Sequence, residues 1–525
     1  MAQSKAKKAL SKGKSKSKEN SKNYGMIVLI AAIILVAALT VYVITDGVLM
    51  RTSLLKDKSF ISSVSEILKK FPANISQKDL DKVKVLTLTA DIKYFEKNSY
   101  YGSQGYTLSF GYDDALELIR KQEADALAQE NDPNYVRDES LDSHTVDELM
   151  LSVSSEINIA DFSSLSCFKN VEYLIISGPN LNYLYYYSMY GMNVDYSLNP
   201  MKELNNVNFI ANMPLLTNVN IYNIPAEDFS AFKNITSIKN LSIQGCKIKD
   251  AGVFADLTNL ETLNLSGTNL ENISFISSFA GLRNLYLSGN AITDITPVQN
   301  LAKLKNLSFE ANQIENASVL NNLVSLKSLN LNSNKIKNAD FLTKLTALES
   351  LSLSDNEIAA IPGLSSLASL KSLDISDNQL TEISGIENCK SLETLNINDN
   401  GTKNDAGEKL TAISDLSPVS KLTALDTLYA DGNNITDISP IAPLKETLKT
   451  LSLKNNKITS ISVLKDFYNL ATLNLDGNMI TDFSPISELE AAGSASISGQ
   501  DNQITENGSN ENENVPDGDI ETPEE

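Results

Sequence analysis

Apolar residues recur along most of the chain with a spacing of 22 residues. One turn of the pattern carries Leu304, Leu307, Phe309, Asn312 and Ile314, and equivalent residues return 22, 44 and 66 positions later. The template LxxLxLxxNx(I/L) continues to residue 400 and resumes at residues 433, 456 and 478. Chance does not maintain a five-point template over so many turns, so the pattern predicts a repeat protein.

Each turn is predicted to contain one short strand. In the LxLxx part, apolar and polar residues alternate, so the two leucines point into a core and the residues between them face outward. Strands of successive turns then pair in parallel, and each turn buries its apolar face against its neighbours. The asparagine stands where the chain leaves the strand, and its amide can bond backbone groups of its own turn and the next. Cys246 and Thr268 take its place in two earlier turns.

The opposite side of each turn is predicted to be short, because one repeat cannot hold a strand, two bends and a long helix. Residues 293–298 read TDITPV, and similar segments recur at 414–419, 436–441 and 481–486. Proline suits the first position of a helix but disrupts its middle, so these segments favour three-ten or irregular structure. The predicted fold is an α/β solenoid with a parallel strand in each turn.

These repeats resemble the 22-residue leucine-rich repeats of the bacterial internalin family, including its T-D-I-S-P-(I/L) segment, over roughly residues 57–500. An apolar stripe of Phe60, Val64, Ile67, Leu68 and Phe71, followed by residues 75–83, is similar to the helical cap of that family. Residues 496–500 resemble its closing strand. The resemblance implies a leucine-rich-repeat arc with both edges covered.

The sequence also departs from that family. It has no LPxTG-like sorting motif, and residues 506–525 hold eight acidic residues and no lysine or arginine, which is typical of a disordered tail. The invasion role of the family is therefore not transferred. We expect a basic tail (1–25), a transmembrane helix (26–45), a helical cap with the first strand (57–88), an insertion with a helix over 112–131 (89–145), the solenoid (146–500) and an acidic tail (501–525).

The run from Met26 to Ile44 contains 19 residues and no charge. At 1.5 Å per helical residue it extends about 28 Å, close to the hydrocarbon thickness of a bilayer. Eight lysines precede it, so the positive-inside rule places the N-terminus in the cytoplasm and the repeats outside. The residues after it make a poor cleavage site, so an uncleaved signal-anchor is favoured over a signal peptide. We expect a single-pass membrane protein with extracellular repeats.

Charge and chemistry narrow the possible functions. The net charge of −21 argues against nucleic acid as a partner, because phosphate binding needs a basic face. His144 is the single histidine, and no nucleophile elbow, phosphate loop, CxxC or HExxH motif is present, so no catalytic residues and no cofactor are predicted. Cys389 falls on a core position of the template. Residues Asp399, Asn404, Asp405 and Glu408 do not match a calcium loop, so no metal is predicted.

Tyrosines point to a recognition surface, since tyrosine offers a large contact area at little entropic cost. Of the 19 tyrosines in the chain, 13 lie between residues 94 and 196, and six crowd one insertion: Tyr183, Tyr185, Tyr186, Tyr187, Tyr190 and Tyr196. These rings could instead pack over the edge of the solenoid. The outward positions of the concave strands are mostly small and polar. They include four candidate ligand contacts: Tyr286, Glu310, Tyr429 and Lys454.

The sequence therefore predicts a non-catalytic module that binds a protein through its concave sheet and tyrosine-rich insertion. Two alternatives remain open. Polar rows and tyrosines also suit a cell-envelope polysaccharide, and the repeats could be a structural spacer.

Overall fold

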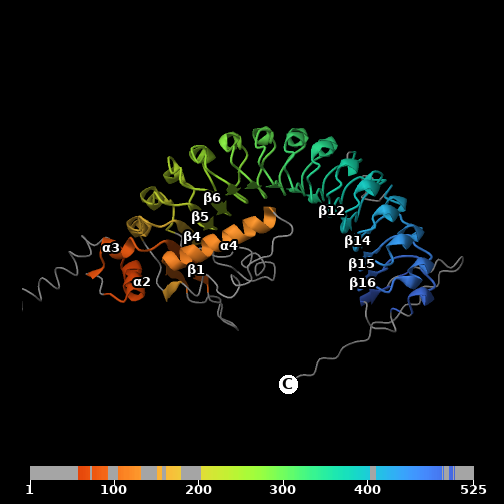
Figure 1. Cartoon of the computed structure of the whole chain (residues 1–525), viewed down its shortest axis with the longest axis horizontal. Helices are drawn as coiled ribbons and strands as arrows, with labels where there is room; N and C mark the ends of the chain where they lie inside the picture. The colour runs from red at the N-terminus through yellow and green to blue at the C-terminus, as the bar shows by residue number, and fades with distance from the viewer. Residues whose placement is uncertain are drawn as a thin grey trace, which may run out of the picture. The chain divides into compact units, whose positions relative to one another are not determined.

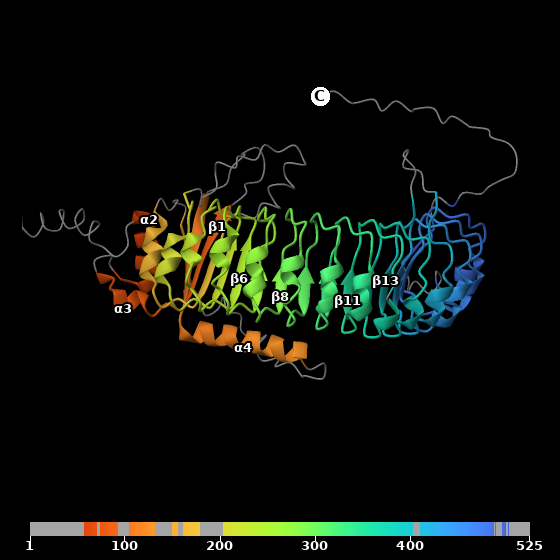
Figure 2. The same ribbon diagram turned by 90° about the horizontal axis from the view of Figure 1, so that it is seen from above.

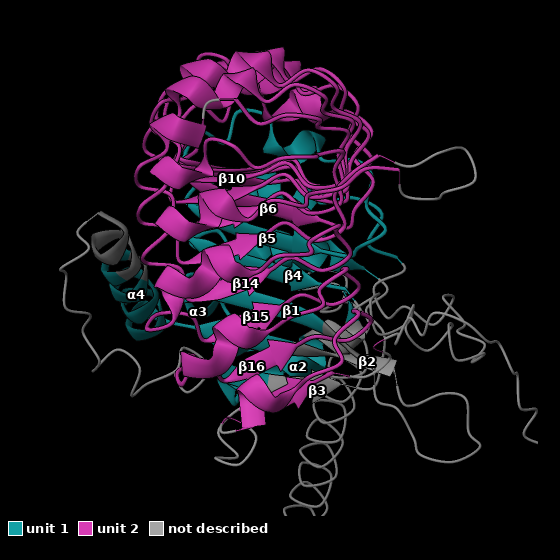
Figure 3. Cartoon of the chain, turned by 90° about the vertical axis from the view of Figure 1, so that its right-hand side faces the viewer, with its two compact units in different colours: residues 1–238 teal, residues 239–525 magenta. Residues whose placement is uncertain are grey.

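The computed structural model describes residues 57–70, 74–92, 104–131, 150–155, 161–178, 203–362, 364–402, 410–487, 489, 496–499 and 502. The chain divides into two compact units, residues 1–238 and 239–525, which Figure 3 colours separately. No helix among the described residues is long and apolar enough to cross a membrane. The predicted transmembrane helix at 26–45 and most of the acidic tail at 501–525 lie outside the described residues.

Unit 1 combines a helical cap, an antiparallel insertion and the first parallel strands. Strand β2 pairs antiparallel with β1 and β3, whereas β1 pairs in parallel with β4, and β4 with β5. Its elements are α2 (Lys58–Leu68), α3 (Gln77–Leu80), β1 (Val85–Ile92), β2 (Gln104–Gly111), α4 (Asp113–Asn131), β3 (Leu151–Ser155), η4 (Phe162–Cys167), β4 (Tyr173–Ser177), η6 (Asn208–Asn212), β5 (Asn218–Tyr222) and η7 (Ser230–Phe232), where η marks a three-ten helix.

The cap forms because its sequence has helical periodicity and a capping signal. Helix α2 buries Ile61, Val64 and Ile67, which recur at a spacing of three on one helical face. At the start of α3, the Asp79 carboxylate accepts hydrogen bonds from the Ser76 backbone N–H at 3.0 Å and its hydroxyl at 2.7 Å. These bonds fix the chain just before β1.

Unit 2 consists of stacked turns, each with a strand on one side and a three-ten helix on the other (Figures 1 and 2). Strands pair in parallel with their sequence neighbours from β6 to β17. The strands are β6 (Asn240–Gln244), β7 (Thr262–Asn264), β8 (Asn284–Tyr286), β9 (Asn306–Ser308), β10 (Ser328–Asn330), β11 (Ser350–Ser352), β12 (Ser372–Asp374), β13 (Thr394–Asn396), β14 (Thr427–Tyr429), β15 (Thr450–Ser452), β16 (Thr472–Asn474) and β17 (Ser496–Ser498). The three-ten helices are η8 (Ala251–Phe254), η9 (Ser274–Ser278), η10 (Thr296–Val298), η11 (Ser318–Asn322), η12 (Asp340–Lys344), η13 (Leu364–Ser366), η14 (Ile386–Asn388), η15 (Ser417–Lys421), η16 (Ser439–Leu444), η17 (Ser462–Asp466) and η18 (Ser484–Ile486).

The repeat template describes the core of unit 2 correctly. Leu304, Leu307, Phe309 and Ile314 are at most 2% exposed, and the equivalent residues of the following turns are buried as well. Asn312 is also buried: its Nδ2 donates to Leu287 O and Phe309 O, each at 2.9 Å, and its Oδ1 accepts from the Ile292 N–H at 3.0 Å. The asparagine thus ties two successive turns together.

One turn breaks this ladder. Asn433 still donates from Nδ2 to Ile397 O at 2.9 Å and Ala430 O at 3.3 Å. Its Oδ1 is buried and has no hydrogen-bond partner among the residues that the structure describes. The preceding turn carries the insertion 401–411, which lengthens the repeat at the point where the missing N–H donor would stand. The insertion therefore costs the structure one buried hydrogen bond.

One detail differs from the simple inside/outside prediction. Ser308, Ser376 and Ser452 occupy positions predicted to face outward but are buried at 9%, 3% and 7% exposure. Their side chains are short, so larger side chains on the neighbouring turns cover them. Each also forms a hydrogen bond with a neighbouring turn, as Ser308 does with Ser288 at 2.8 Å. Cys389 is a buried core residue, as predicted, and burial raises the pKa of its thiol to about 11.

Candidate functional site

The outward positions of the unit 2 strands form a continuous polar surface. In register across β12, β13, β14 and β15, the second outward position holds Asp374, Asn396, Tyr429 and Ser452. Because parallel strands lie about 4.8 Å apart, these side chains stand close enough to contact one ligand together. Two residues further along each turn, a third outward position holds Ser376, Asn398, Asp431 and Lys454.

Hydrogen bonds between turns hold this surface in place. Asn330 Nδ2 donates to Glu310 Oε2 at 3.1 Å, and Asn306 Nδ2 donates to Asn284 Oδ1 at 2.7 Å. Asp431 accepts from the Ser452 hydroxyl at 2.6 Å and the Lys454 backbone N–H at 2.7 Å. Side chains that are already fixed lose little conformational entropy when a partner binds.

The structure places four of the predicted contact residues on this surface. Tyr286 ends β8 and is half-buried, and Tyr429 ends β14 and is 37% exposed. Glu310 and Lys454 are exposed. They do not form one cluster, because Tyr286 and Glu310 lie on neighbouring turns, several turns before Tyr429 and Lys454. The six tyrosines at 183–196 lie outside the described residues, so the structure does not test that part of the predicted site.

Carboxylates concentrate around Tyr429. Asp374 lies on the same row two strands away, and Asp431 lies two residues along the chain. Burial raises the pKa of Asp431, and the nearby Asp399 carboxylate raises it further, against the lowering effect of bonds from Ser452 and Lys454. The pKa of Asp431 therefore depends on neighbouring charges and hydrogen bonds as well as on burial.

Charges alternate along the start of the unit 2 strands. Glu261 pairs with Lys239 at 3.7 Å and with Arg283 at 3.8 Å. Glu349 pairs with Lys327 at 3.0 Å and with Lys371 at 3.8 Å. Exposed ion pairs of this kind contribute little stability. Their main effect is that positive and negative side chains at the start of the strands neutralise one another.

In unit 1, helix α4 covers part of the strand surface. Ala115, Leu116 and Ile119 pack against Val85, with Met150 and Tyr173 beside them. Arg120 pairs with Glu172, which also lies 3.7 Å from Lys84 Nζ. The helix therefore occupies a surface that the strands would otherwise present to a partner.

The sequence analysis did not predict that two further tyrosines, Tyr173 and Tyr222, lie on that surface. Tyr173 begins β4 and accepts a hydrogen bond from Asn220 Nδ2 at 3.3 Å, and Tyr222 ends β5; both are half-buried. Alternation in NVNIY, and the place of Tyr173 next to Leu174 and Ile176 at the inward positions of YLIIS, carried the signal that could have found them.

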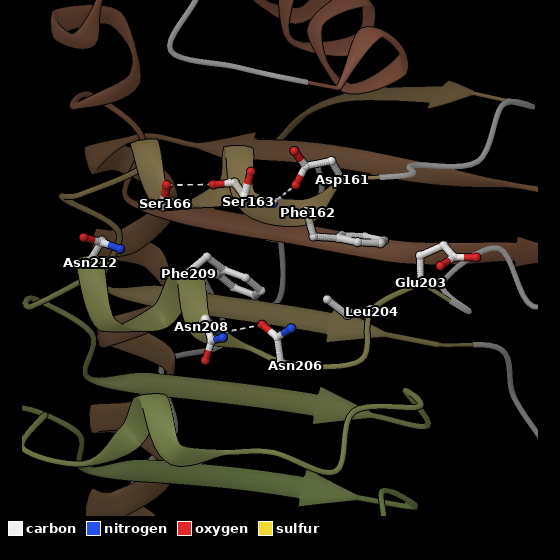
Figure 4. Close-up of a pocket in the computed structure, with 10 residues that line it drawn as sticks. All are labelled: Asp161, Phe162, Ser163, Ser166, Glu203, Leu204, Asn206, Asn208, Phe209 and Asn212. Carbon is white, nitrogen blue, oxygen red and sulfur yellow. Dashed lines mark hydrogen bonds between the residues drawn. The ribbon is translucent and has the colours of Figure 1, made fainter.

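A second feature missed by the sequence is a pocket of about 370 Å³ in unit 1, between η4 and η6 (Figure 4). Its apolar wall comes from Phe162, Leu204 and Phe209, all nearly buried. The polar rim comprises Asp161, Ser163, Ser166, Glu203, Asn206, Asn208 and Asn212. Asp161 and Asn206 accept hydrogen bonds from the backbone N–H groups of Ser163 and Asn208 at 2.8 and 3.1 Å, so both partly serve the turns themselves.

Within the described part of the chain, no group of three or more His, Cys, Asp or Glu side chains is arranged to hold a metal ion. His144 lies outside the described residues.

Comparison with known proteins agrees with this geometry. The family model described as "Leucine Rich repeats (2 copies)" matches residues 236–278, 281–322, 324–366, 368–406 and 446–488. The crystal structure of the internalin InlF from Listeria monocytogenes is 29% identical, with a TM-score of 0.52, over 56% of this chain and 83% of its own. Among curated proteins, none matches the sequence.

Two further solved structures are similar in sequence or extent. Internalin C2 from Listeria monocytogenes is 32% identical over 43% of this chain and 83% of its own, with a TM-score of 0.32. A leucine-rich-repeat protein of Leptospira interrogans is 21% identical over 64% of this chain and 91% of its own, with a TM-score of 0.49.

Proposed function

Since the chain is an internalin-like leucine-rich-repeat protein, we propose that it is a non-catalytic binding module that recognises a protein partner outside a membrane. Leucine-rich-repeat folds typically serve protein–protein interaction, and internalin-like proteins are non-enzymatic. The observation that carries the proposal is the polar strand surface of unit 2, with Tyr286 and Tyr429 as its aromatic side chains. Protein interfaces concentrate their binding energy in such anchors.

The proposed contact surface has two parts. One is the strand surface of unit 2, including Tyr286, Glu310, Tyr429 and Lys454. The other is the tyrosine-rich segment 183–196, supported by its composition alone. Insertions in solenoids tend to fall on one face, which is often the binding face.

Display outside the membrane is supported by the sequence. The uncharged run 26–44 is long enough to span a bilayer, and the eight lysines before it favour a cytoplasmic N-terminus. In this arrangement the repeats of both units lie on the extracellular side of a single-pass anchor.

A cell-envelope polysaccharide is the second candidate ligand, because the strand surface is rich in hydroxyl and amide groups that can bond sugars. The full chain, in non-ionic detergent, can be tested for capture of surface-exposed proteins and, in parallel, of purified envelope polymer. Specific capture of a protein supports the proposal, whereas capture of the polymer alone replaces it with the second candidate.

Variants then locate the contact. Changing Tyr185, Tyr186 and Tyr187 together to Ser should weaken capture at least tenfold if the insertion is the principal contact, because each aromatic anchor can contribute about 2 kcal/mol or more. Changing Tyr429 to Ser and Lys454 to Ala tests the strand surface in the same assay. If capture withstands both sets of changes while the proteins remain folded, the proposed contact surface is wrong.

A further inference from the structure

From the first strand residue onward, the outward positions of four successive turns around Tyr429 carry only negative charge, while Lys371, one residue before β12, pairs with Glu349 at 3.8 Å. We call this surface, from β11 to β14, the Tyr429 face. Its carboxylates are Asp355, Asp374, Asp377, Asp399 and Asp431. The remaining outward positions from Ser350 to Gly432 are Ser, Thr, Asn, Tyr and Gly, with no lysine or arginine among them. The nearest exposed cation on the same rows is Lys454, one strand beyond.

Three of these carboxylates form a row of like charges. Asp355, Asp377 and Asp399 occupy equivalent positions of consecutive turns, each one residue before the ladder asparagine. Hydrogen bonds from Asp355 N to Ser376 O (3.1 Å) and from Asp377 N to Asn398 O (2.9 Å) hold successive turns in register. Neighbouring turns stand about 4.8 Å apart, and like charges placed opposite one another destabilise a sheet.

The fold does not require aspartate at this position. The backbone there is left-handed, with φ near +50 to +55° in Asp355, Asp377 and Asp399. Other turns fill the same position with Gly289, Ala311, Ser333 or Asn455, all at positive φ. Asp tolerates this backbone, but the turn accepts Gly, Ala, Ser or Asn equally, so the turn alone does not select three successive carboxylates. A partner that carries the opposite charge would select them.

Tyr429 adds an aromatic surface to the same face. It is 37% exposed and stands in register with Asn396, which is in register with Asp374. A guanidinium or ammonium group binds favourably over a tyrosine ring, and carboxylates at its edge strengthen the contact. The polar bonds across the face, including Ser354 Oγ to Ser376 Oγ at 2.8 Å, hold the surrounding groups in place.

Resting on the proposed function, we propose that the Tyr429 face binds an extended arginine- or lysine-rich segment of the partner protein. The segment would run across the strands, with one cation against Tyr429 and others along the row from Asp355 to Asp399. Charge complementarity selects this occupant, because an acidic or apolar segment would meet five carboxylates.

The test uses the full chain in non-ionic detergent and a fluorescein-labelled nona-arginine peptide, followed by fluorescence anisotropy at several salt concentrations. The triple variant Asp355→Asn, Asp377→Asn, Asp399→Asn keeps residues that tolerate the left-handed backbone. We expect it to bind nona-arginine about tenfold more weakly, with a smaller salt dependence. A nona-glutamate peptide should not bind.

The charge-matched control is Glu271→Gln, Glu315→Gln, Glu382→Gln, which removes three exposed carboxylates away from the Tyr429 face. It should weaken binding less than about threefold, since distant exposed charges are screened. Tyr429→Phe should retain binding, and Tyr429→Ser should weaken it about threefold or more. Equal losses in the two triple variants would show that net charge alone attracts the peptide, and would overturn the proposal.

Two further outcomes separate the alternatives. Tighter peptide binding after deletion of residues 1–25 would identify the chain's own lysine tail as the occupant and would also overturn it. If the captured partner protein binds the Asp→Asn triple variant as tightly as the native chain, the proposed function stands and the cationic contact is wrong. Failure to capture any protein would instead contradict the proposed function itself.

Discussion

Asn356 shows how a single side chain joins two turns of the solenoid. Its Nδ2 donates to Leu331 O and Leu353 O, both at 3.0 Å, and its Oδ1 accepts from the Ile336 N–H at 3.0 Å. Asn356→Ala leaves these buried backbone groups without partners and should lower the free energy of unfolding by about 1–3 kcal/mol. Urea denaturation measures the loss.

Two companion variants calibrate that value. Leu351→Ala removes a fully buried side chain and should cost about 2–5 kcal/mol, whereas Ser352→Ala, on the outward side of the same strand, should stay within about 0.5 kcal/mol. A Ser352 effect as large as that of Leu351 would mean that the two faces of the strand are reversed.

At the residue scale, periodicity predicts which side chains are buried but not how their neighbours meet. The ladder asparagines could be predicted because one amide must serve two turns. The contact of Asp399 with Gly432 could not: a Cβ at residue 432 would lie 2.1 Å from Asp399 Oδ1, across an insertion. Likewise, the burial of Ser308 depends on the size of the side chains on neighbouring turns. The alternation of apolar and polar residues along one strand does not predict that size.

In each three-ten helix of the T-D-I-S-P type, the aspartate before the N-cap residue accepts a hydrogen bond from the N–H of the first helical residue. Asp437 Oδ1 accepts from the Ser439 N–H at 2.8 Å, and Asp294, Asp415 and Asp482 do the same in their own turns. These bonds hold the pKa of each carboxyl below its ordinary value of 3.8. The family segment is thus explained by an acceptor that satisfies the first N–H of the helix.

The pH dependence follows from the direction of these shifts. A carboxyl whose pKa is lowered on folding stabilises the native state above about pH 4, and this contribution is lost as the pH falls through the lowered pKa. Changing Asp294, Asp415, Asp437 and Asp482 together to Asn keeps an acceptor, as Asn272, Asn316 and Asn338 show in other turns. The variant should therefore lose less stability than the native protein between pH 7 and pH 3.

Thermal unfolding at several pH values measures this difference. Asp437→Ala removes the acceptor and should lower Tm at neutral pH, while Asp437→Asn should not. Parallel acid destabilisation of the native chain and the fourfold Asn variant would show that these caps do not contribute to the acid response.

The insertion at 401–411 can be removed without breaking the template. Deletion joins Asn400 to Ala412 and places Ile413 two residues after the ladder asparagine, where Ile314 follows Asn312. Ile413 already accepts from Asn434 N at 2.9 Å, as Ile292 does from Gln313 at 3.0 Å. The Ile413 N–H could then reach the unpartnered Asn433 Oδ1.

We expect the deletion variant to fold and to gain about 1–3 kcal/mol, because a buried acceptor acquires its donor and the exposed Leu410 is lost. Urea denaturation compared with the native chain tests this, with Asn433→Ala in both backgrounds as a control. Loss of cooperative unfolding would contradict the expectation and indicate that the insertion is needed for folding.

At the scale of elements, the strands and short helices of unit 2 could be predicted because every turn repeats the same constraint. The antiparallel strands β2 and β3 could not. They lie beside α4 in a segment without the 22-residue template. The pairing of β2 with β1 and with β3 depends on contacts between residues distant in sequence, such as Phe110 with Leu86 and with Leu151. The helix α4, in contrast, carries its own periodicity in Leu116 and Ile119, both buried.

The whole chain is divided sharply by charge. Residues 1–25 carry eight lysines and one glutamate, a net charge of +7. Because the whole chain has a net charge of −21, the remaining residues carry −28. Such an asymmetry across an apolar run is the pattern that orients membrane proteins, because lysines before the run resist translocation. The acidic body, including the Tyr429 face, would then meet partners on the outer side.

This orientation predicts that residues 57–525 are accessible from outside the cell. Protease added to intact cells, with any wall opened first, should digest the repeats while a cytoplasmic protein survives. Changing six of the eight lysines to Ser should raise the fraction of inverted or untranslocated chains, since the K/R bias sets the topology. Carbonate extraction should leave the chain in the membrane. Repeats that resist protease while a known surface protein is digested would place them in the cytoplasm and remove the basis for an extracellular partner.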